Sequence, residues 1–473
     1  MSYLHDLTAL EQAAAIRSGE LSPVELVIHY IERIHTLGGE LGAFVTATPD
    51  LAVAQAKRAA DLARTSNRDD LPPLLGVPTA IKDLTATAGT RTTFGSRLFR
   101  DNVPDTDANS VVLLREAGTI SLGKTNTPEF GTCCYTDNDV VGLARSPWDM
   151  TCNAGGSSGG AAAAVAAGLV PFAHGSDGGG SLRIPASVCG LVGFKPSRGR
   201  VSVGPADGES PGLSIQGPLA RTVRDAAAML DAMAGPMPGD AYWAEPLPAG
   251  ETFLGYAERE PGRLRIGRYA TPASGTVPAP ECLAAWEDVS AVLAGLGHDV
   301  EDIDLPFGPA IIDCFNTVWA VKALDTVTDE AGEQLLRPIT RAWRAYGRTK
   351  TGADYAAAVK AMQVEARTSL LATAAYDIIV TPTLGLPPQK VEFFAEDGEP
   401  LDNLRRQGAF TPFTGVYNMT GQPAVSLPLH WTADGVPIGV SLIGRPAADG
   451  LLISLSAQLE QARPWADRKP ACW

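Results

Sequence analysis

Three short stretches of the chain carry side chains that could together perform nucleophilic chemistry. They are Lys82 at the end of an apolar run, the Gly/Ser turn 155–160 with Ser157 and Ser158, and the segment 177–185, which reads DGGGSLRIP and contains Ser181. A serine hydroxyl is a weak nucleophile until an adjacent base removes its proton. A neutral lysine could be that base, and the N–H groups of a glycine run could converge on an oxyanion.

Each stretch also has a simpler interpretation. Three glycines before a serine can form a plain turn, and a serine between glycines can cap a helix. Lys82 could extend its charge to solvent along its aliphatic stem. Removing the proton from an ordinary lysine at pH 7 costs about 4.6 kcal/mol, so Lys82 could serve as a base only if burial lowered its pKa.

Other kinds of site fit the sequence less well. Neither glycine stretch reads as a phosphate loop or a dinucleotide fingerprint. The Gly/Ser turn matches G-x-S-x-G, but no apolar strand precedes it and the late histidines, His298 and His430, lack a triad context, which disfavours an α/β-hydrolase. His174 is interpreted as a hydrogen-bonded core residue. Seven cysteines without C-x-x-C and six scattered histidines predict no metal site and a reducing compartment.

The elements that must position these residues alternate between strands and helices. Strands are predicted at 119–123, 171–176, 265–269, 298–303, 378–381, 424–427 and 438–442, with another ending at 82–83. Helices are predicted at 23–36, 51–64, 107–117, 161–167, 222–234, 280–296 and 450–461, with two or three more within 309–374. This alternation predicts an α/β fold with a mixed, largely buried sheet.

The composition is that of an ordinary globular protein. The 473 residues are 45% hydrophobic and 19% charged, with a net charge of −15 and no long basic run, which excludes a nucleic acid or an anionic membrane as the expected partner. The first residues do not form a signal peptide, and the weakly apolar stretch 161–173 is too short to cross a bilayer. We therefore expect a cytoplasmic protein.

Further motifs surround the three stretches and together resemble the amidase signature family. They are GVP at 76–78, KD at 82–83, GKTN at 123–126, PWD at 147–149, GFKP at 193–196, TPT at 381–383, GQPA at 421–424 and PIG at 437–439. The resemblance covers nearly the whole chain and implies a large, twisted mixed β-sheet covered by helices on both faces. It also implies one domain, 1–473, comprising an N-terminal helical layer (1–70), a catalytic core (71–235), a variable, largely helical substrate-side region (236–415) and C-terminal strands with a helix (416–473).

The resemblance assigns a role to each chemical group. Lys82 would be the general base, Ser157 a bridging serine held by a cis peptide bond, and Ser181 the nucleophile of a Ser-cisSer-Lys triad. The oxyanion hole would consist of the backbone N–H groups of Gly178, Gly179, Gly180 and Ser181. No metal and no cofactor are implied.

Five further residues are interpreted as structural. Ser158, Asp177 and Arg183 flank the reacting serines and would support the site, because buried charges need partners. Lys124 and Lys195 are rival candidates for the base, but the family pattern places them in structural positions.

The amino-acid sequence around Ser181 is most similar to that of bacterial amidases that act on aryl amides, carbamates and nylon oligomers, such as 6-aminohexanoate cyclic-dimer hydrolases and urethanases. This implies a hydrolase that cleaves the C–N bond of small apolar or aryl amides, with carbamates and esters as further candidate substrates, acting as a monomer or homodimer. The alternative is a glutamine-hydrolysing amidotransferase subunit, which would depend on partner chains. A binding module without catalysis is disfavoured because all three triad residues are present.

The substrate pocket is expected to involve the loop 131–138, with Gly131, Cys133 and Cys134, and the segments 309–345 and 385–415. Apolar candidates for its wall, each of which could instead belong to the core, are Phe315, Trp319, Leu335, Leu384, Leu386, Phe410 and Phe413.

Overall fold

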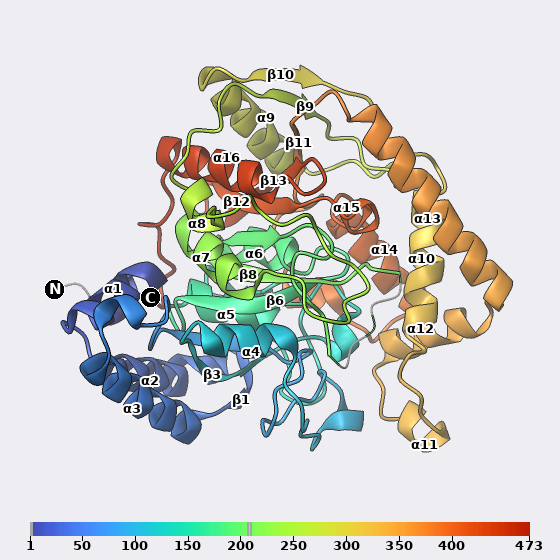
Figure 1. Cartoon of the computed structure of the whole chain (residues 1–473). Helices are drawn as coiled ribbons and strands as arrows, with labels where there is room; N and C mark the ends of the chain where they lie inside the picture. The colour runs from blue at the N-terminus through green and yellow to red at the C-terminus, as the bar shows by residue number, and fades with distance from the viewer. Residues whose placement is uncertain (1–2, 206–207, 209–210) are drawn as a thin grey trace.

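The centre of the fold is an eight-stranded mixed sheet in the order β10-β9-β11-β13-β12-β7-β8-β6 (Figure 1). Its strands are β6 (Phe172–Asp177), β7 (Val192–Lys195), β8 (Ile215–Ala220), β9 (Arg265–Arg268), β10 (Asp299–Asp302), β11 (Ile378–Pro382), β12 (Ala424–Trp431) and β13 (Pro437–Gly444). The strands β10, β9 and β11 are parallel to one another, and the remaining neighbours pair antiparallel. The structure is a computed structural model that describes residues 3–205, 208 and 211–473.

A three-stranded sheet in the order β1-β3-β2 lies next to β6. It consists of β1 (Phe44–Ala47), β2 (Pro78–Lys82) and β3 (Ile120–Thr125), and a short hairpin, β4 (Arg145–Ser146) and β5 (Asp149–Asn153), stands apart from it. The Thr79 hydroxyl of β2 donates to the Phe172 carbonyl of β6 at 3.3 Å. Further along the same two strands, Lys82 reaches Ser176, so the carboxyl ends of β2 and β6 meet at one point.

Helices cover both faces of the large sheet, as predicted. Alternate residues of the strands point to opposite faces: Phe172, Val425 and Val440 belong to the core cluster under α7, α9 and α16, whereas Ala173 belongs to the cluster around α2, α5 and α6. The helices outside 309–420 are α1 (Ala9–Ser18), α2 (Pro23–Leu41), α3 (Pro49–Thr65), α4 (Asn109–Glu116), α5 (Gly159–Ala166), α6 (Arg183–Cys189), α7 (Val223–Met233), α8 (Phe253–Tyr256), α9 (Pro280–Gly295) and α16 (Asp449–Ala462).

The helix α5 is buried along its whole length. Its sequence is almost entirely alanine and glycine, so it can approach its neighbours closely: a Cβ on Gly160 would come within 2.2 Å of the Asn126 backbone nitrogen. Alanine also has the highest helix propensity. This small-residue helix fixes the position of Ser157 and Ser158, which directly precede it.

The region 309–420 contributes β11 to the large sheet and a group of helices that lie toward the right of Figure 1. It contains α10 (Ile311–Lys322), α11 (Glu330–Glu333), α12 (Pro338–Arg348), α13 (Gly352–Ala372), α14 (Pro400–Phe410) and α15 (Val416–Thr420). The stretch 309–374 was predicted to hold two or three helices, but it holds four, because the one-turn α11 separates α10 from α12. Short 3₁₀ helices lie at Leu4–Asp6, Arg68–Asp70, Arg97–Phe99, Glu129–Gly131 and Val391–Phe394.

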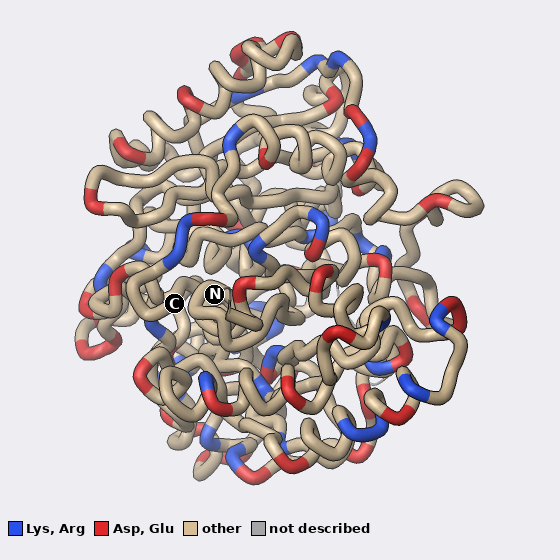
Figure 2. Tube along the Cα trace, turned by 90° about the vertical axis from the view of Figure 1, so that its left-hand side faces the viewer, with Lys and Arg blue, Asp and Glu red and all other residues tan. Residues whose placement is uncertain are grey.

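Charged residues of both signs are interspersed along the chain trace (Figure 2). No helix in the described ranges is long and apolar enough to cross a membrane.

Candidate active site

Ser157 lies in the turn between β5 and α5. The Gly156–Ser157 peptide bond is cis, and Gly156 lies directly against the Tyr135 backbone: a Cβ there would be 2.6 Å from the Tyr135 carbonyl oxygen. Glycine is therefore required by the close approach of the two backbones. The packing fixes the direction in which the Ser157 hydroxyl leaves the turn.

Lys82 is completely buried and points toward Ser157. Its Nζ donates to Ser157 Oγ at 2.7 Å, to Ser176 Oγ at 3.0 Å and to the Ser176 carbonyl oxygen at 3.2 Å. Burial lowers the pKa of Lys82 to about 7, although the negative charge of Asp177 acts in the opposite direction. Near neutral pH, a large share of Lys82 is therefore an unprotonated amine in contact with a hydroxyl group.

Lys124 and Lys195 are also buried, and burial lowers the pKa of each to about 7 as well. Their contacts differ from those of Lys82. Lys124 donates to the Thr85 carbonyl and, at 2.9 Å, to Thr87 Oγ1. Lys195 donates to the carbonyl oxygens of Pro196 and Gln422. Neither amine contacts Ser157, so the hydrogen bonds separate Lys82 from its rivals although the pKa values do not.

Asp177 and Arg183 hold the glycine turn between β6 and α6. Their ion pair is bidentate, with both nitrogen–oxygen distances at 3.0 Å and both side chains fully buried. Burial alone would raise the pKa of Asp177, but the Arg183 guanidinium outweighs it and holds this pKa well below its usual range. Asn418 donates to the Asp177 carboxylate at 2.9 Å, and Arg183 donates to Asn418 Oδ1 at 2.8 Å. These charges are thus fully paired with each other and orient the backbone.

The Asp177 carboxylate also accepts two backbone N–H groups of the turn. Gly180 donates at 2.7 Å and Leu182 at 3.2 Å. The Gly180 N–H, predicted as an oxyanion donor, is therefore engaged in this structure. Within the described ranges, the N–H groups of Gly178, Gly179 and Ser181 make no hydrogen bond to the protein.

Ser181 follows the glycines at the bottom of a cavity. Its carbonyl accepts the Ser158 N–H at 3.2 Å, and Ser158 Oγ donates to the Ser176 carbonyl at 3.1 Å, so Ser158 joins the two serine-containing turns. Ser181 is only 7% exposed but lines the cavity. No hydrogen bond joins Ser157 and Ser181 in the part of the chain that the structure describes.

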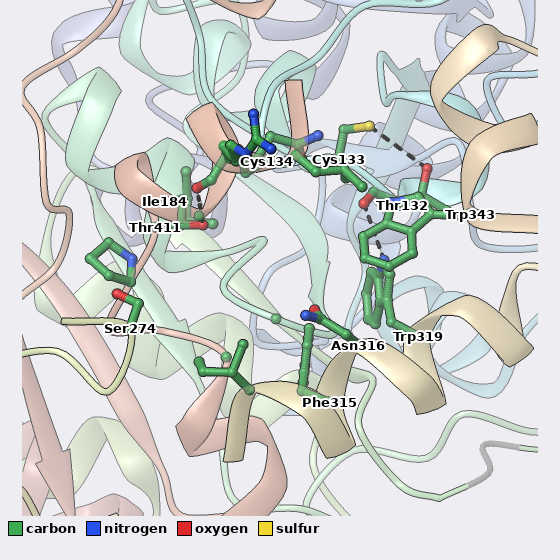
Figure 3. A pocket seen from close by; sticks show the side chains of 18 of the residues that line it. Thr132, Cys133, Cys134, Ile184, Ser274, Phe315, Asn316, Trp319, Trp343 and Thr411 are labelled. Carbon is green, nitrogen blue, oxygen red and sulfur yellow. Dashed lines mark hydrogen bonds between the residues drawn. The ribbon is translucent and has the colours of Figure 1, made fainter. Parts of the chain in front are cut away.

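The cavity above Ser181 has a volume of about 740 Å³. Figure 3 shows Thr132, Cys133 and Cys134 on one side and Phe315 and Asn316 on the opposite side. The other lining residues are Gly131, Gly179, Ile184, Ser274, Ile311, Ile312, Trp319, Ala342, Trp343, Tyr346, Pro400, Leu401, Leu404, Arg405, Gln407, Gly408, Thr411, Pro412, Gly415, Val416 and Met419. The wall is mainly apolar, and Arg405 is its one charged member among the described residues.

Known proteins share both this sequence and this architecture. A family model described as Amidase matches residues 25–453. The chain is 37% identical to 6-aminohexanoate-cyclic-dimer hydrolase from Paenarthrobacter ureafaciens, over 98% of this chain and 96% of the relative. It is 36% identical to an acylamidase from Rhodococcus erythropolis, over 99% and 98% of the two chains. The solved structure of a bacterial aryl acylamidase of the amidase signature family superposes with a TM-score of 0.87 at 27% identity, covering 98% of both chains.

The chain belongs to the amidase signature family. It is an enzyme that hydrolyses amide bonds, which agrees with the interpretation made from its motifs.

The wall of the amidase cavity matches the sequence expectation in part. Gly131, Cys133 and Cys134 line it, as do Phe315 and Trp319. Leu335, Leu384, Leu386, Phe410 and Phe413 do not line it; for Leu384, Phe410 and Phe413, which are almost completely buried in the core clusters, the alternative of a core position holds. An apolar residue type alone does not distinguish the wall of a cavity from the core.

The surroundings of Cys133, Cys134 and His174 do not favour nucleophilic or base chemistry. Burial raises the pKa of Cys133 to about 12 and that of Cys134 well above its usual value, so both thiols are protonated. His174 is buried and hydrogen-bonded to Gln216 at 2.9 Å, as predicted.

Sequence reasoning missed Ser176, which accepts two hydrogen bonds from Lys82. A signal was available: Ser176 is the last residue but one of β6, directly before Asp177 and the glycine turn. Asn316 and Gln407 lie within the predicted pocket segments 309–345 and 385–415 but were not singled out, and Tyr346 lies one residue beyond the first segment.

Proposed function

We propose that this amidase cleaves small apolar and aryl amides through an acyl-enzyme on Ser181, with Lys82 as the base acting through Ser157. The observation that carries the proposal is the 2.7 Å hydrogen bond between Ser157 Oγ and a buried Lys82 whose pKa lies at about 7. A general base is most effective when its pKa is close to the working pH.

Protons move in one direction to form the first tetrahedral intermediate. Neutral Lys82 takes the hydroxyl proton of Ser157, and Ser157 takes the proton of Ser181. The Ser181 oxygen then bonds to the amide carbonyl carbon. This relay requires the Ser181 hydroxyl to come within hydrogen-bond reach of Ser157, and such contacts tighten when substrate binds.

Collapse of the tetrahedral intermediate reverses the proton movement. The C–N bond breaks, and the Lys82 ammonium returns its proton through Ser157 to the leaving nitrogen. Water then attacks the acyl carbon by the same base-assisted route and releases the carboxylic acid and Ser181. The negative oxygen of each intermediate would be stabilised by the N–H groups of Gly178, Gly179 and Ser181, because that of Gly180 is held by Asp177.

The cavity wall supports the substrate class. A mainly apolar surface favours substrates that bury apolar groups. None of the described lining residues is acidic, so no carboxylate faces the cavity to pair with the ammonium group of glutamine. This disfavours the glutamine-hydrolysing alternative. Carbamates and esters present the same carbonyl to Ser181 and are included in the proposal.

The first test uses two substrates, a short-acyl 4-nitroanilide and the matching aryl carbamate. Amine release is measured from the anilide, and both amine release and ester cleavage are measured from the carbamate. Free glutamine is the control. Ser181→Ala should lower turnover by several orders of magnitude, since removal of a nucleophilic serine has cost about 10⁶-fold in one serine hydrolase. Release from glutamine alone would refute the substrate class. A loss of less than tenfold in Ser181→Ala would refute the nucleophile.

A further inference from the structure

Three segments that are far apart in the sequence form one side of the cavity. They are the loop 131–139, which we call the cysteine loop, the helix α12 with Trp343 and Tyr346, and α14 with the residues that precede it from 391. Each segment turns one face to the cavity. On the side away from the cavity, all three contact a single residue, Arg337.

Arg337 is the N-cap residue of α12, and its side chain is 12% exposed. Its guanidinium donates to Asp137 at 2.9 Å and to Asp139 at 2.8 Å, both in the cysteine loop. It also donates to Glu396, at 2.8 and 3.1 Å, just before α14. The Arg337 guanidinium therefore connects the start of α12 to two carboxylates of the cysteine loop and to one carboxylate that precedes α14.

The beginning of α12 is held by two of the neighbouring acids. The Arg337 N–H donates to Glu129 at 2.8 Å, and Glu129 also accepts the Ser96 hydroxyl at 2.6 Å. The Ile339 N–H approaches Glu396 at 3.4 Å. Carboxylates are favourable at this end of a helix, where backbone N–H groups lack partners.

A chain of hydrogen bonds continues from Arg337 to the cavity surface. Glu396 accepts the Tyr135 hydroxyl at 2.7 Å, and Asn403 approaches that hydroxyl at 3.4 Å. Gln407 donates to Asn403 at 2.6 Å and accepts the Cys134 N–H at 3.2 Å. Gln407 and Cys134 both line the cavity. The ion cluster is thus connected to the wall that a substrate would contact.

Removing the guanidinium would leave Asp137, Asp139 and Glu396 close together without a cation. Unpaired carboxylates in a partly buried site repel one another and draw in water. The stacked rings of Tyr135 and Phe394, with centroids 4.7 Å apart, would still join two of the segments. The segments would remain folded against the enzyme but would no longer be fixed at one separation.

We propose that Arg337 is a positioning residue that sets the width of the cavity and thereby the preference for bulky apolar acyl groups. This inference rests on the proposed function, in which the cavity receives the apolar part of the amide. Arg337 lies outside the cavity lining and acts through the cysteine loop and α14.

The experiment compares Arg337→Met, Arg337→Lys and Arg341→Met with the wild-type enzyme. Arg341 lies one turn along the same helix, takes no part in the cluster and does not line the cavity, so its variant is the matched control. The substrates are the acetyl and octanoyl amides of 4-nitroaniline, which share a leaving group. Amide hydrogen exchange is measured on the same four proteins without substrate.

In Arg337→Met, we expect KM for the octanoyl amide to rise at least tenfold, KM for the acetyl amide less than threefold, and kcat to change little for either. A higher KM with an unchanged kcat is expected when a variant loses an interaction that stabilises the bound substrate and the transition state equally. Exchange should accelerate at 132–139 and 394–408 but not along β6. The KM and exchange values of Arg337→Lys should lie between those of the wild type and Arg337→Met, because an ammonium cannot engage the three carboxylates as a guanidinium does. Arg341→Met should match the wild type.

Unchanged exchange in both segments of Arg337→Met would overturn the inference, whatever the activity. So would an equal fall of kcat/KM for the two amides. If the wild-type enzyme cleaved neither amide, the proposed substrate class would fail, while the exchange data would still decide whether Arg337 fixes the wall.

Discussion

The lowered pKa of Lys82 predicts a specific dependence of activity on pH. If the neutral amine is the base, kcat/KM follows the unprotonated fraction. With a pKa of about 7, this fraction rises from about one tenth at pH 6 to about nine tenths at pH 8, so kcat/KM should rise about tenfold. An ordinary lysine, with a pKa near 10.4, would give a rise of about 100-fold over the same interval that continues to pH 10.

The assay uses a neutral 4-nitroanilide, whose own protonation does not change over pH 5.5–9. Other buried groups also have pKa values at about 7, namely Lys124, Lys195 and Glu460. The matched control is therefore Lys124→Met, which removes a buried lysine that does not contact Ser157 and should keep the pH-dependent rise. Lys82→Met should abolish both the rise and nearly all of the activity. Thermal unfolding at each pH shows whether the protein remains folded.

Two results would refute the reasoning. A profile that is flat from pH 6 to 8, under conditions where single-turnover kinetics show the chemical step to be rate-limiting, would mean that Lys82 does not remove the proton. A rise that continues to pH 10 would mean that burial does not lower its pKa, and the hydrogen bond to Ser157 would then come from an ammonium over the whole working range.

Two further predictions concern Lys82 and Gly131. The pKa of Lys82 is about 7 in the folded chain and about 10.4 in the unfolded chain. Burial of the charged amine therefore lowers the free energy of unfolding by its full amount below pH 7, and this destabilisation disappears as pH rises through 10.4. Lys82→Met should therefore raise the free energy of unfolding at pH 6 by up to about 5 kcal/mol, before the lost hydrogen bonds are subtracted, and by less at pH 10. Urea unfolding at the two pH values measures this difference, and equal changes at both would contradict the prediction. Gly131 has a φ of +68°, and a Cβ there would lie 2.6 Å from Leu84 Cδ1 and 3.2 Å from Ser157 Oγ. Gly131→Ala should lower kcat by about 10- to 100-fold by displacing Ser157; an unchanged kcat would show that the loop yields without disturbing the serine.

Most of the sheet and the surrounding helices could be predicted from periodicity, and the failures have local causes. The helix α6 was missed because Pro185 indicates a break. This proline occupies the third position of the helix, where its missing N–H would have no partner within the helix. The strand β8 was missed for a related reason. Pro218 argues against a strand between two neighbours, yet it pairs with His174 in the antiparallel register of β6 and β8.

The parts of the site that depend on distant residues could not be predicted in the same way. Sequence motifs pointed to Lys82, Ser157 and Ser181, which are brought to one place by the ends of β2, β5 and β6. No local pattern indicates that Arg337 meets Asp137, 200 residues earlier, or that Asp177 engages the N–H of Gly180. Such contacts depend on how complete elements pack, and alternating apolar and polar residues specify only which face of an element is buried.

The three buried lysines show why a residue type with a shifted pKa does not by itself identify a base. Burial lowers the pKa of Lys82, Lys124 and Lys195 to the same value of about 7. Lys124 and Lys195 contact carbonyl oxygens and a threonine hydroxyl away from the cavity, so a proton taken up by either has no path to a substrate. Lys82 alone of the three contacts Ser157, in the Gly/Ser turn between β5 and α5. The fold thus accepts the same unfavourable burial three times, and in the proposed mechanism the position of one hydroxyl group, Ser157 Oγ, determines which of the three amines acts as the base.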